Sequence, residues 1–456
     1  MKIIIVGDGK VGGTLAERLS QENHDITVID RLADRLRQTG EQLDVMTVEG
    51  NGATRAVQLE AGVEDADLLI AATASDELNL LACLVARKSG AKHTIARIRD
   101  PAYNRDLDLL KDDLGLSMLV NPEMAVAMEI SRLLRFPSAI TVDTFAKGRV
   151  ELLQIPIPDS MDGMTLKEFG RSKVSVLICV VERAGKVYIP SGTFRLLKGD
   201  KISFVASAGN SEAFLRQIGY ISSPIREVML VGGGRIGYYL AAALLERGMS
   251  VTIIEARHER CEELSELLPR ASIICGNGTD QQLLLEEGLQ HMDAFVALTG
   301  IDEENILMGL YAGVHTKAKV VTKLNRVGFE DVIDNLNLGS VFYPRYVAAE
   351  QIVRYVRAMQ NSLGSNVETL YHLAGTRIEA LEFRVTAGAK LCGIPLQQLH
   401  FRENLLIASI NRDGHIIIPG GSDTIEQGDT VIVVTTNHGL NDLNDILARN
   451  PQEGTA

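Results

Sequence analysis

The sequence predicts an α/β protein in which two doubly wound parallel sheets are each followed by a small α+β module. In two long segments, short apolar runs alternate with helical stretches, which is the pattern of a parallel sheet covered by helices on both faces. Both segments open on the motif Gly-x-Gly-x-x-Gly, and features of the first recur in the second at offsets of 225 to 229 residues. A repeat whose spacing drifts so little over a whole unit indicates a duplicated chain.

Short apolar runs predict the strands of the first segment, which extends to residue 137. They lie at residues 3–6, 26–29, 45–48, 68–72, 94–98 and 118–120. Between them, residues 14–22, 77–88 and 123–134 have the apolar spacing of amphipathic helices. The crossovers between parallel strands should be right-handed. For the helix at residues 123–134, a place in the core is the simplest interpretation, and a dimer or crossover contact is the alternative.

A different pattern begins near residue 139 and extends to residue 220, where short strands alternate with turns. Strands are expected at residues 151–155, 174–182, 186–189 and 202–206, with one short helix at residues 165–169. This hairpin spacing predicts a small α+β module. Pro190 and Gly199-Asp200 recur as Pro419 and Gly428-Asp429, so the module is repeated as well.

The repeat divides the chain into four predicted domains. Two sheet-forming domains cover residues 1–137 and 225–358, and the small modules cover residues 138–222 and 365–456. The predicted boundaries are the polar stretches Ser222-Ser223-Pro224 and Gly364-Ser365-Asn366.

Each glycine-rich motif follows an apolar run and opens a helix, which is the context of a dinucleotide-binding Rossmann fold. In the first copy, Gly7 allows the tight turn, Gly9 lets the backbone approach a pyrophosphate, and Gly12 lets helix and strand pack closely. The N–H groups at the helix start then face the phosphates. The second copy repeats these residues as Gly232, Gly234 and Gly237. A turn in a ligand-free fold is the alternative interpretation.

A carboxylate ends the second predicted strand of each copy, Asp30 in the first and Glu255 in the second. An acid at this place accepts both ribose hydroxyls and repels a 2′-phosphate, which favours NAD(H), or an adenine nucleotide such as ATP or ADP, over NADP. Arg31, beside Asp30, weakens this exclusion in the first copy. A solvated acid at the strand end is the alternative.

Cations lie at matched places in the two copies. Lys10 and Arg235 occupy the variable fourth position of their motifs, where a cation can contact a further phosphate. On the fifth predicted strand, Arg97 has Lys323 as its counterpart, and both should point toward the edge of the same crevice. Arg99 has Asn325 instead, so a role of Arg99 would be confined to the first copy.

Polar side chains follow the fourth predicted strand of each copy. Thr73 and Thr299 end these strands, where doubly wound folds place a wall of the ligand site. Asp76 and Asp302, together with Ser75, are expected to cap the following helices, with direct ligand contact as the alternative. The full set of candidate nucleotide-binding residues is Gly7, Gly9, Lys10, Val11, Gly12, Asp30, Thr73, Arg97, Gly232, Gly234, Arg235, Ile236, Gly237, Glu255 and Thr299.

The composition excludes several classes of function. A net charge of -13 argues against a nucleic-acid binder, which normally carries a basic stripe, and against direct adhesion to an anionic membrane. The nine histidines show no HExxH or paired-ligand spacing, so no metal site is predicted. No apolar run approaches the roughly 20 residues that span a bilayer. The chain begins on a predicted strand without a charged-then-apolar leader, which favours a soluble cytosolic protein.

The cysteines are scattered and never spaced as CxxC. They are Cys83, Cys179, Cys261, Cys275 and Cys392. We expect them to be small buried hydrophobic residues in a reducing cytosol.

The duplicated motifs resemble the TrkA family, the peripheral nucleotide-binding subunits of bacterial Trk potassium-uptake systems. Members carry tandem RCK (KTN) domains, each followed by a TrkA-C domain. The resemblance covers essentially the whole chain. Its specific parts in the first copy are the motif with Asp30, the turn Gly50-Asn51-Gly52, residues 73–79 and residues 95–99. Those in the small modules are Ile189-Pro190-Ser191-Gly192 with Gly199-Asp200, and Ile418-Pro419-Gly420-Gly421 with Gly428-Asp429.

The resemblance implies a cytoplasmic regulatory protein with NAD(H) or ATP/ADP in its Rossmann domains. It would form a homo-oligomeric gating ring, expected to be tetrameric, docked through a partner on the inner face of the cell membrane. That partner would be a membrane potassium-channel subunit of Trk type. Residues 320–325 are less basic than residues 95–99, so the second site is expected to hold its ligand more weakly or to choose another.

Two other functions compete with this interpretation. An NAD-dependent dehydrogenase needs a catalytic acid–base group and a substrate domain over the nicotinamide. The small modules offer no compact constellation of such residues, so we expect no catalytic activity. A regulatory subunit of another cation transporter, such as an antiporter, is the second alternative, because the residues alone do not name the membrane partner.

Overall fold

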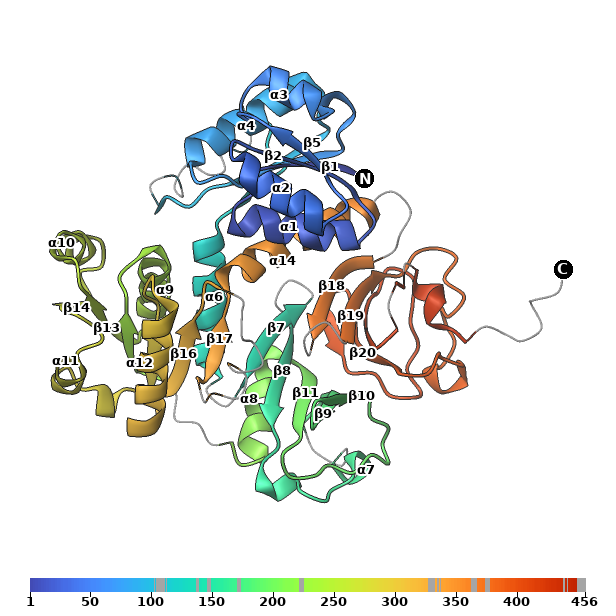
Figure 1. Ribbon diagram of the computed structural model, residues 1–456. Coiled ribbons are helices and arrows are strands. Elements are labelled where there is room, and N and C mark those ends of the chain that lie inside the picture. Colours follow the sequence, from blue (N-terminus) through green and yellow to red (C-terminus); the bar gives the residue numbers. More distant parts are fainter. Residues whose placement is uncertain are drawn as a thin grey trace. The chain divides into compact units, whose positions relative to one another are not determined.

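The computed structural model divides the chain into two compact units (Figure 1). The first unit consists of residues 1–134 and 225–353, and the second of residues 135–224 and 354–456. The structure describes residues 1–448 except 102, 104–110, 112, 137–138, 146–148, 170–173, 221–224, 327–332, 334–335, 337, 362–366, 374–377, 438 and 441. The boundaries predicted at residues 222–224 and 364–366 lie outside the described residues, and the division into four domains stays a prediction.

The first part of unit 1 is a parallel sheet that is, within the described residues, six-stranded, in the order β3-β2-β1-β4-β5-β6. Its strands are β1 (Lys2–Val6), β2 (Asp25–Asp30), β3 (Met46–Glu49), β4 (Leu68–Ala71), β5 (His93–Arg97) and β6 (Met118–Val120). The helices include α1 (Lys10–Gln21), α2 (Ala33–Gln42), α3 (Arg55–Glu60), α4 (Asp76–Ser89) and α6 (Pro122–Arg135). The strand order reverses at β1, where Ile3 pairs with Ile26 on one side and Leu68 on the other. Ligands bind at such a reversal, beyond the carboxyl ends of the strands.

The second part of unit 1 repeats this topology in the order β14-β13-β12-β15-β16-β17. Its strands are β12 (Glu227–Val231), β13 (Ser250–Glu255), β14 (Ser272–Cys275), β15 (Ala294–Ala297), β16 (Lys319–Lys323) and β17 (Ser340–Phe342). Its helices include α9 (Arg235–Glu246), α10 (His258–Leu267), α11 (Gln281–Glu286), α12 (Asp302–His315) and α14 (Pro344–Asn361). The predicted fold class, with its duplicated doubly wound sheets, is confirmed.

The central strands are buried on both faces, which explains their continuous apolar runs. Ile3, Ile5 and Leu68 are each at most 1% exposed. Burial of such branched side chains favours extended backbone and contributes about 1.5 to 3 kcal/mol per residue to folding. Within the described residues, no helix is both long and apolar enough to cross a bilayer.

Unit 2 contains two antiparallel sheets, in the orders β10-β9-β11-β8-β7 and β18-β19-β22-β20-β21. The first consists of β7 (Thr141–Phe145), β8 (Val150–Pro156), β9 (Val176–Arg183), β10 (Lys186–Tyr188) and β11 (Lys201–Ser207), with helices α7 (Leu166–Phe169) and α8 (Ala208–Gln217). The second consists of β18 (Val367–Leu373), β19 (Ile378–Arg384), β20 (Leu405–Arg412), β21 (His415–Ile417) and β22 (Thr430–Thr435). Side chains of both sheets, among them Leu152, Val180, Ala380 and Ile432, pack in one apolar cluster.

The structure corrects three sequence-based expectations. The first small module contains β7 and α8 in addition to the predicted strands and single short helix, because α8 packs its Phe214 against Phe204 of β11. Thr73 and Thr299 lie beyond β4 and β15, which end two residues earlier. Cys275 is exposed rather than buried, since it ends β14 at the edge of its sheet.

The recurring Gly-Asp turn of the small modules is held by an ion pair with an arginine. In the first module, Asp200 is 1% exposed and accepts two hydrogen bonds of 2.7 Å from Arg183 and one of 2.8 Å from the Leu197 amide. Burial by itself raises the pKa of Asp200, but the bonds from Arg183 and Leu197 outweigh it, so that the pKa is lowered. In the second module, Asp429 and Arg412 form the same pair.

We therefore expect Asp200→Asn to destabilise unit 2 by about 2 kcal/mol at neutral pH, because the half-buried guanidinium of Arg183 loses its charged partner. Since the pKa is lowered on folding, the stabilisation is present above the ordinary aspartate value of about 3.9 and disappears as the pH falls through the lowered pKa. Urea unfolding at several pH values measures it. Asp159→Asn is the control, because the Asp159–Lys198 pair is highly exposed and should contribute little. Equal effects of the two substitutions would contradict the assignment.

Candidate functional site

The turn between β1 and α1 requires glycine at two of its three motif positions. Gly7 has a φ of +101°, which L side chains rarely adopt, and a Cβ there would lie 3.0 Å from the Thr73 backbone. A Cβ on Gly12 would overlap with the carbonyl oxygen of Gly7. These contacts hold the start of α1 against the end of β1, as the sequence predicts for the first and third glycines.

The second glycine of the motif, Gly9, has open space around the position of a Cβ. A Cβ on Gly9 would have no atom within 4 Å, and its φ of -88° is open to any residue. Gly9 is the N-cap of α1 and makes no side-chain capping bond, so the amides of the first turn face open space. A helix start of this kind attracts an anion through its N–H groups and its positive dipole end.

In the second motif, too, the first and third glycines are sterically required and the second is not. Gly232 has a φ of +110°, and a Cβ on Gly237 would overlap with the Gly232 carbonyl. Gly234 is the N-cap of α9, again without a side-chain cap, and a Cβ there would meet no atom within 4 Å. Both copies therefore present an uncapped helix start with room in front of it.

The two predicted ribose acids differ in their partners. Asp30 accepts hydrogen bonds from the amides of Asp8 (2.6 Å) and Leu32 (2.9 Å). Glu255 is 7% exposed and accepts from the Gly233 amide at 2.9 Å, while Arg257 approaches its other oxygen with Nε at 3.1 Å. The carboxylate of the second copy is therefore already paired with a cation.

A cavity of about 570 Å³ lies at the carboxyl ends of the first sheet. Its wall includes the motif residues Gly7 and Gly9, the acid Asp30, and the turn at residues 50–52. Five cations also line it, namely Lys10, Arg31, Arg35, Arg97 and Arg99. The volume is in the range of sites for nucleotide-sized ligands.

A second cavity, of about 290 Å³, lies within unit 1 and is lined by residues of both copies. Its wall contains the cations Lys10, Arg97, Arg235, Lys323 and Arg345, with Glu123 among them. Burial lowers the pKa of Arg97, and Glu123, 3.7 Å away, partly restores it. Burial likewise lowers the pKa of Lys323, whose ammonium donates to the Leu298 carbonyl at 3.1 Å. So many cations in one cavity of an acidic chain favour an anionic ligand.

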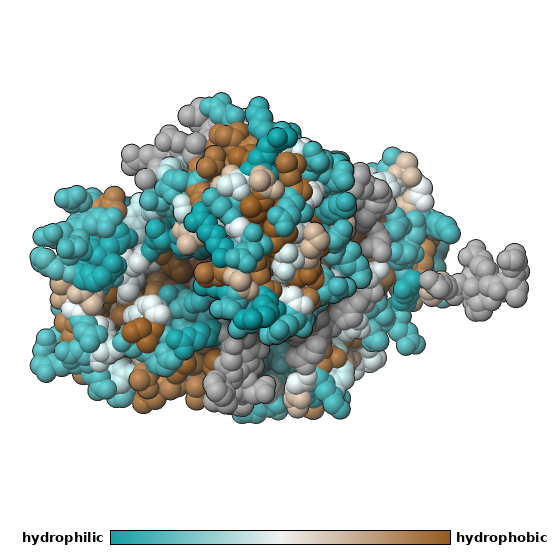
Figure 2. All heavy atoms as spheres, turned by 45° about the horizontal axis from the view of Figure 1, so that its top comes forward, coloured by the Kyte–Doolittle hydropathy of each residue, from teal (hydrophilic) through white to brown (hydrophobic). Residues whose placement is uncertain are grey.

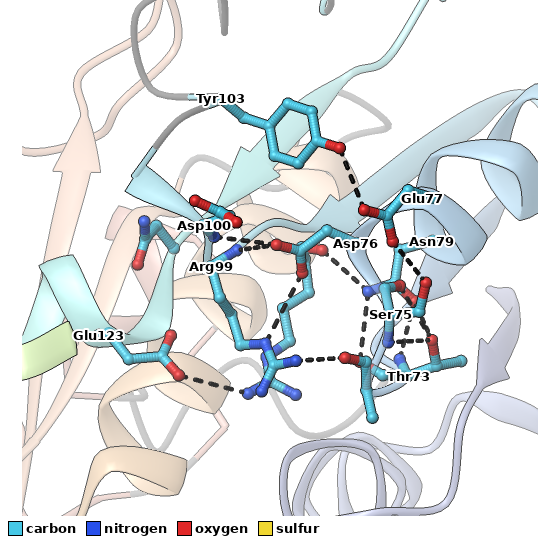
Figure 3. A network of polar contacts seen from close by, with 12 residues as sticks. Thr73, Ser75, Asp76, Glu77, Asn79, Arg99, Asp100, Tyr103 and Glu123 are labelled. Atoms are coloured by element: carbon cyan, nitrogen blue, oxygen red, sulfur yellow. Dashed lines mark hydrogen bonds and ion pairs between the residues drawn. The ribbon is translucent and has the colours of Figure 1, made fainter. Parts of the chain in front are cut away.

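The polar residues after β4 form a network that braces the sheet (Figure 3). The Thr73 amide and hydroxyl both donate to the Asn79 side-chain oxygen, at 2.8 and 2.7 Å, and Asn79 donates to the Arg97 carbonyl at 2.9 Å. The second copy repeats these bonds with Thr299, Asn305 and Lys323. The hydroxyl groups of Thr73 and Thr299 thus donate their hydrogen bonds within the protein, to Asn79 and Asn305.

The capping prediction is correct for Ser75 and wrong for Asp76 and Asp302. Ser75 accepts from the Leu78 amide at 3.1 Å, whereas the N-cap of α12 is Ile301. Asp76 instead accepts from the amides of Arg99 and Asp100, each at 2.9 Å, so it ties the end of β5 to α4. Asp302 does the same for the amides that follow β16.

The comparisons with known proteins agree with this duplicated geometry. Residues 3–122 and 228–344 match the TrkA-N domain, and residues 151–219 and 380–448 match the TrkA-C domain. The chain is 32% identical over 444 residues to the Trk system potassium uptake protein TrkA of Vibrio alginolyticus, with 96% of each chain covered. The chain belongs to the TrkA family. The Halomonas elongata TrkA is 34% identical over 439 residues, 95% of each chain.

Solved structures show that the TrkA-family chain shares its fold with the GsuK RCK domain. The crystal structure of the GsuK RCK domain superposes with a TM-score of 0.62 at 20% identity, covering 95% of this chain and 92% of that one. The GsuK channel bound to NAD gives a TM-score of 0.61 at 20% identity, covering 95% of this chain and 76% of that one. At this identity the likeness shows the shared fold.

In this TrkA-family chain, most of the predicted site residues lie at the cavities. Those lining the first cavity are Gly7, Gly9, Lys10, Val11, Asp30, Thr73 and Arg97. Those of the second motif that line the smaller cavity are Gly234, Arg235, Ile236 and Gly237. Gly12 and Gly232 take part in the close contacts of the two turns. Glu255 accepts a hydrogen bond from the Gly233 amide of the second motif, and Thr299 is hydrogen-bonded to Asn305 after the end of β15. The assignment of these residues to nucleotide binding stays a prediction.

Sequence reasoning missed two charged residues at the smaller cavity. Glu123 and Arg345 each follow a proline at the start of a helix, Pro122 of α6 and Pro344 of α14. The matched proline was the available signal, since it places these side chains at corresponding positions in the two copies. Their opposite charges show that the duplicated sites have diverged.

We expect Gly12→Ala to destabilise unit 1 by about 3 kcal/mol, because its Cβ would overlap with the Gly7 carbonyl and force the helix away from the strand. Gly9→Ala is the matched control and should cost no more than about 1 kcal/mol, since its Cβ meets no atom. Denaturant unfolding measures both. A Gly9 variant as unstable as the Gly12 variant would contradict the division of roles.

Proposed function

We propose that the chain is the cytosolic regulatory subunit of a bacterial potassium-uptake channel, which binds NAD(H) and ATP or ADP and gates its membrane partner. The observation that carries the proposal is the pair of uncapped helix starts, each beside a ribose-type acid, in a TrkA-family chain. A subunit that binds these nucleotides would make the activity of the transporter depend on the energy state of the cell.

The geometry of the first cavity supports a nucleotide with an unphosphorylated ribose. Asp30 lines this cavity and carries a negative charge, so it would accept ribose hydroxyls and repel a 2′-phosphate. The amides at the start of α1, together with Lys10 and Arg97, would hold the phosphates. The GsuK channel, which has a related fold, has been solved bound to NAD, and this supports the same class of ligand.

Gating follows if two nucleotides prefer different conformations of the assembly. A ligand shifts a conformational equilibrium only by its difference in affinity for the two states. Ligands that differ in length and charge, such as NADH and ATP, would reach different cations around the cavities. The proposed action is therefore nucleotide binding without turnover. The resulting conformational change would be transmitted to a Trk-type membrane subunit at the inner face of the cell membrane.

Asp30→Ala should weaken NADH and ATP binding at the first site by about tenfold or more, because the ribose hydroxyls lose a charged acceptor. It should also reduce the discrimination between NADH and NADPH. Titration calorimetry measures both effects, and absorbance at the nicotinamide band checks that no nucleotide is consumed. Asp34→Ala is the control, since the Asp34 side chain is 86% exposed on α2. Unchanged affinity of the Asp30 variant for every nucleotide would refute the assigned pocket.

The outer face of α12 supports assembly of several chains into a ring. Leu307 is 68% exposed and Val314 is 79% exposed on this helix, and Leu81 occupies the position of Leu307 in the first copy and is 50% exposed. Figure 2 shows that apolar side chains reach the surface in several patches. The exposed leucine shared by both copies, together with Val314 of the second, favours contacts with further copies of the chain.

Leu307→Asp should therefore lower the mass of the assembly at micromolar concentration, because a carboxylate would be buried in the contact. Analytical ultracentrifugation measures the mass. Lys317→Asp, which introduces the same acid beyond the end of α12, should leave the mass unchanged. An intact assembly in the Leu307 variant would show that this face lies outside the ring contact.

A further inference from the structure

A pair of thiols lies beside the acid of the second nucleotide site. Cys261 belongs to α10 and Cys275 ends β14. Both lie against Glu255, because the Cys261 sulfur donates to the Glu255 carbonyl and Cys275 is the partner of Glu255 in the adjacent strand. The Cys275 sulfur lies 3.8 Å from Nδ1 of His258, whose Nε2 is 3.4 Å from a carboxylate oxygen of Glu262. A thiol, an imidazole and a carboxylate in line are the groups that activate a sulfur nucleophile.

The two thiols differ in their access to solvent. Cys275 is exposed, whereas Cys261 is 7% exposed. Burial, together with the neighbouring Cys275 thiol, raises the pKa of Cys261 to about 11. Burial raises the pKa of both Cys83 and Cys179 to about 12, so these thiols stay protonated and shielded. Cys275 is therefore the sulfur that a solution oxidant reaches first.

The thiol of Cys261 is hydrogen-bonded to the backbone of Glu255, the predicted ribose-binding acid. Sγ of Cys261 donates to the Glu255 carbonyl at 3.3 Å, and the Gly276 amide donates to the same oxygen at 3.0 Å. Cys275 is paired with Glu255 across β13 and β14. A covalent change in the thiol pair therefore acts on the strand that holds Glu255 against the second motif.

The first copy lacks this arrangement. Leu36 of α2 occupies the place of Cys261, and it is 4% exposed. Glu49 occupies the place of Cys275, because it is paired with Asp30 as Cys275 is with Glu255. The thiol pair is thus a property of the second site alone, and the first site is a control within the same chain.

We propose that Cys261 and Cys275 form an oxidisable dithiol through which hydroperoxides lower nucleotide affinity at the second site. The Cys275 thiolate, its proton held by His258, attacks the terminal oxygen of the hydroperoxide. The O–O bond breaks, the alkoxide or hydroxide leaves with the proton from His258, and Cys275 becomes a sulfenic acid. The Cys261 sulfur then attacks the Cys275 sulfur, and water leaves with the Cys261 proton. The two thiols are oxidised to a disulfide, and the hydroperoxide is reduced to an alcohol, or to water, plus water.

The effect on the nucleotide rests on the proposed function of the second copy. The disulfide removes the hydrogen that Cys261 donates to Glu255. It also draws the end of β14 toward α10, because a covalent S–S bond is shorter than any contact between two unbonded sulfur atoms. We expect affinity at the second site to fall by about fivefold, the size of one lost hydrogen bond. Affinity at the first site should not change.

The first experiment tests the chemistry without any nucleotide. The full-length chain is treated with limiting hydrogen peroxide, and peptide mass mapping should find Cys261 joined to Cys275. Cys392→Ser should form the same bond, whereas Cys275→Ser should form none. Cys261→Ser should accumulate a sulfenic acid on Cys275 that dimedone traps, and His258→Ala should slow oxidation by about tenfold. A map in which Cys275 forms bonds only between chains would overturn the proposal.

The second experiment tests the coupling. Asp30→Ala isolates the second site and Glu255→Ala the first, and NADH and ATP are titrated before and after oxidation. The Asp30 variant should lose about fivefold in affinity on oxidation and recover it with dithiothreitol, while the Glu255 variant stays constant. A disulfide that leaves the Asp30 variant unchanged would overturn the coupling. If the reduced Asp30 variant binds no nucleotide, the proposed second site fails instead, and the peptide map still decides the thiol chemistry.

Discussion

The close approach of strand and helix at each glycine-rich turn is the constraint on which the rest of unit 1 depends. Gly12 packs against the carbonyl of Gly7, and Gly237 packs against that of Gly232, with no room for a Cβ at either contact. This packing fixes the direction of α1 and α9, so the amides at their first turns point past the carboxyl ends of the sheets. The carboxylates at the ends of β2 and β13 then accept hydrogen bonds from the turns before these helices, from the amides of Asp8 and Gly233.

The sequence predicted the features that depend on local pattern. Strand–helix alternation, the duplication, the tight turn at Gly7 and the close packing at Gly12 follow from periodicity and glycine spacing, and the structure agrees with them. Features that depend on long-range packing could not be predicted. Asp76 fits a capping pattern, yet its carboxylate accepts a hydrogen bond from the Arg99 amide, which follows β5 and is distant in sequence. The exposure of Cys275 follows from the place of β14 at the sheet edge, which no local pattern encodes.

The two copies keep the same scaffold and differ in charge. Asp30 is held by backbone amides alone, whereas Glu255 also pairs with Arg257. At the start of α6 the first copy has Glu123, and at the start of α14 the second has Arg345. The turns and strands are preserved because steric overlap penalises change there, while side chains at the cavity rim are free to vary. Under the proposed function, divergence of the rim would supply the difference in affinity that a sensor of two ligands needs.

The cations of the smaller cavity explain how an acidic chain can favour anions. Screening limits the repulsion from the net charge of -13 to about 8 Å at physiological ionic strength, so buried groups dominate near the cavity. Burial lowers the pKa of Arg97 and Lys323, which means that their charged forms are under-solvated in the fold. An anion placed among them would replace the missing solvation and raise both pKa values again. Because Arg97 comes from the first copy and Lys323 from the second, such an anion would stabilise both copies together, and its binding would be coupled to how they pack.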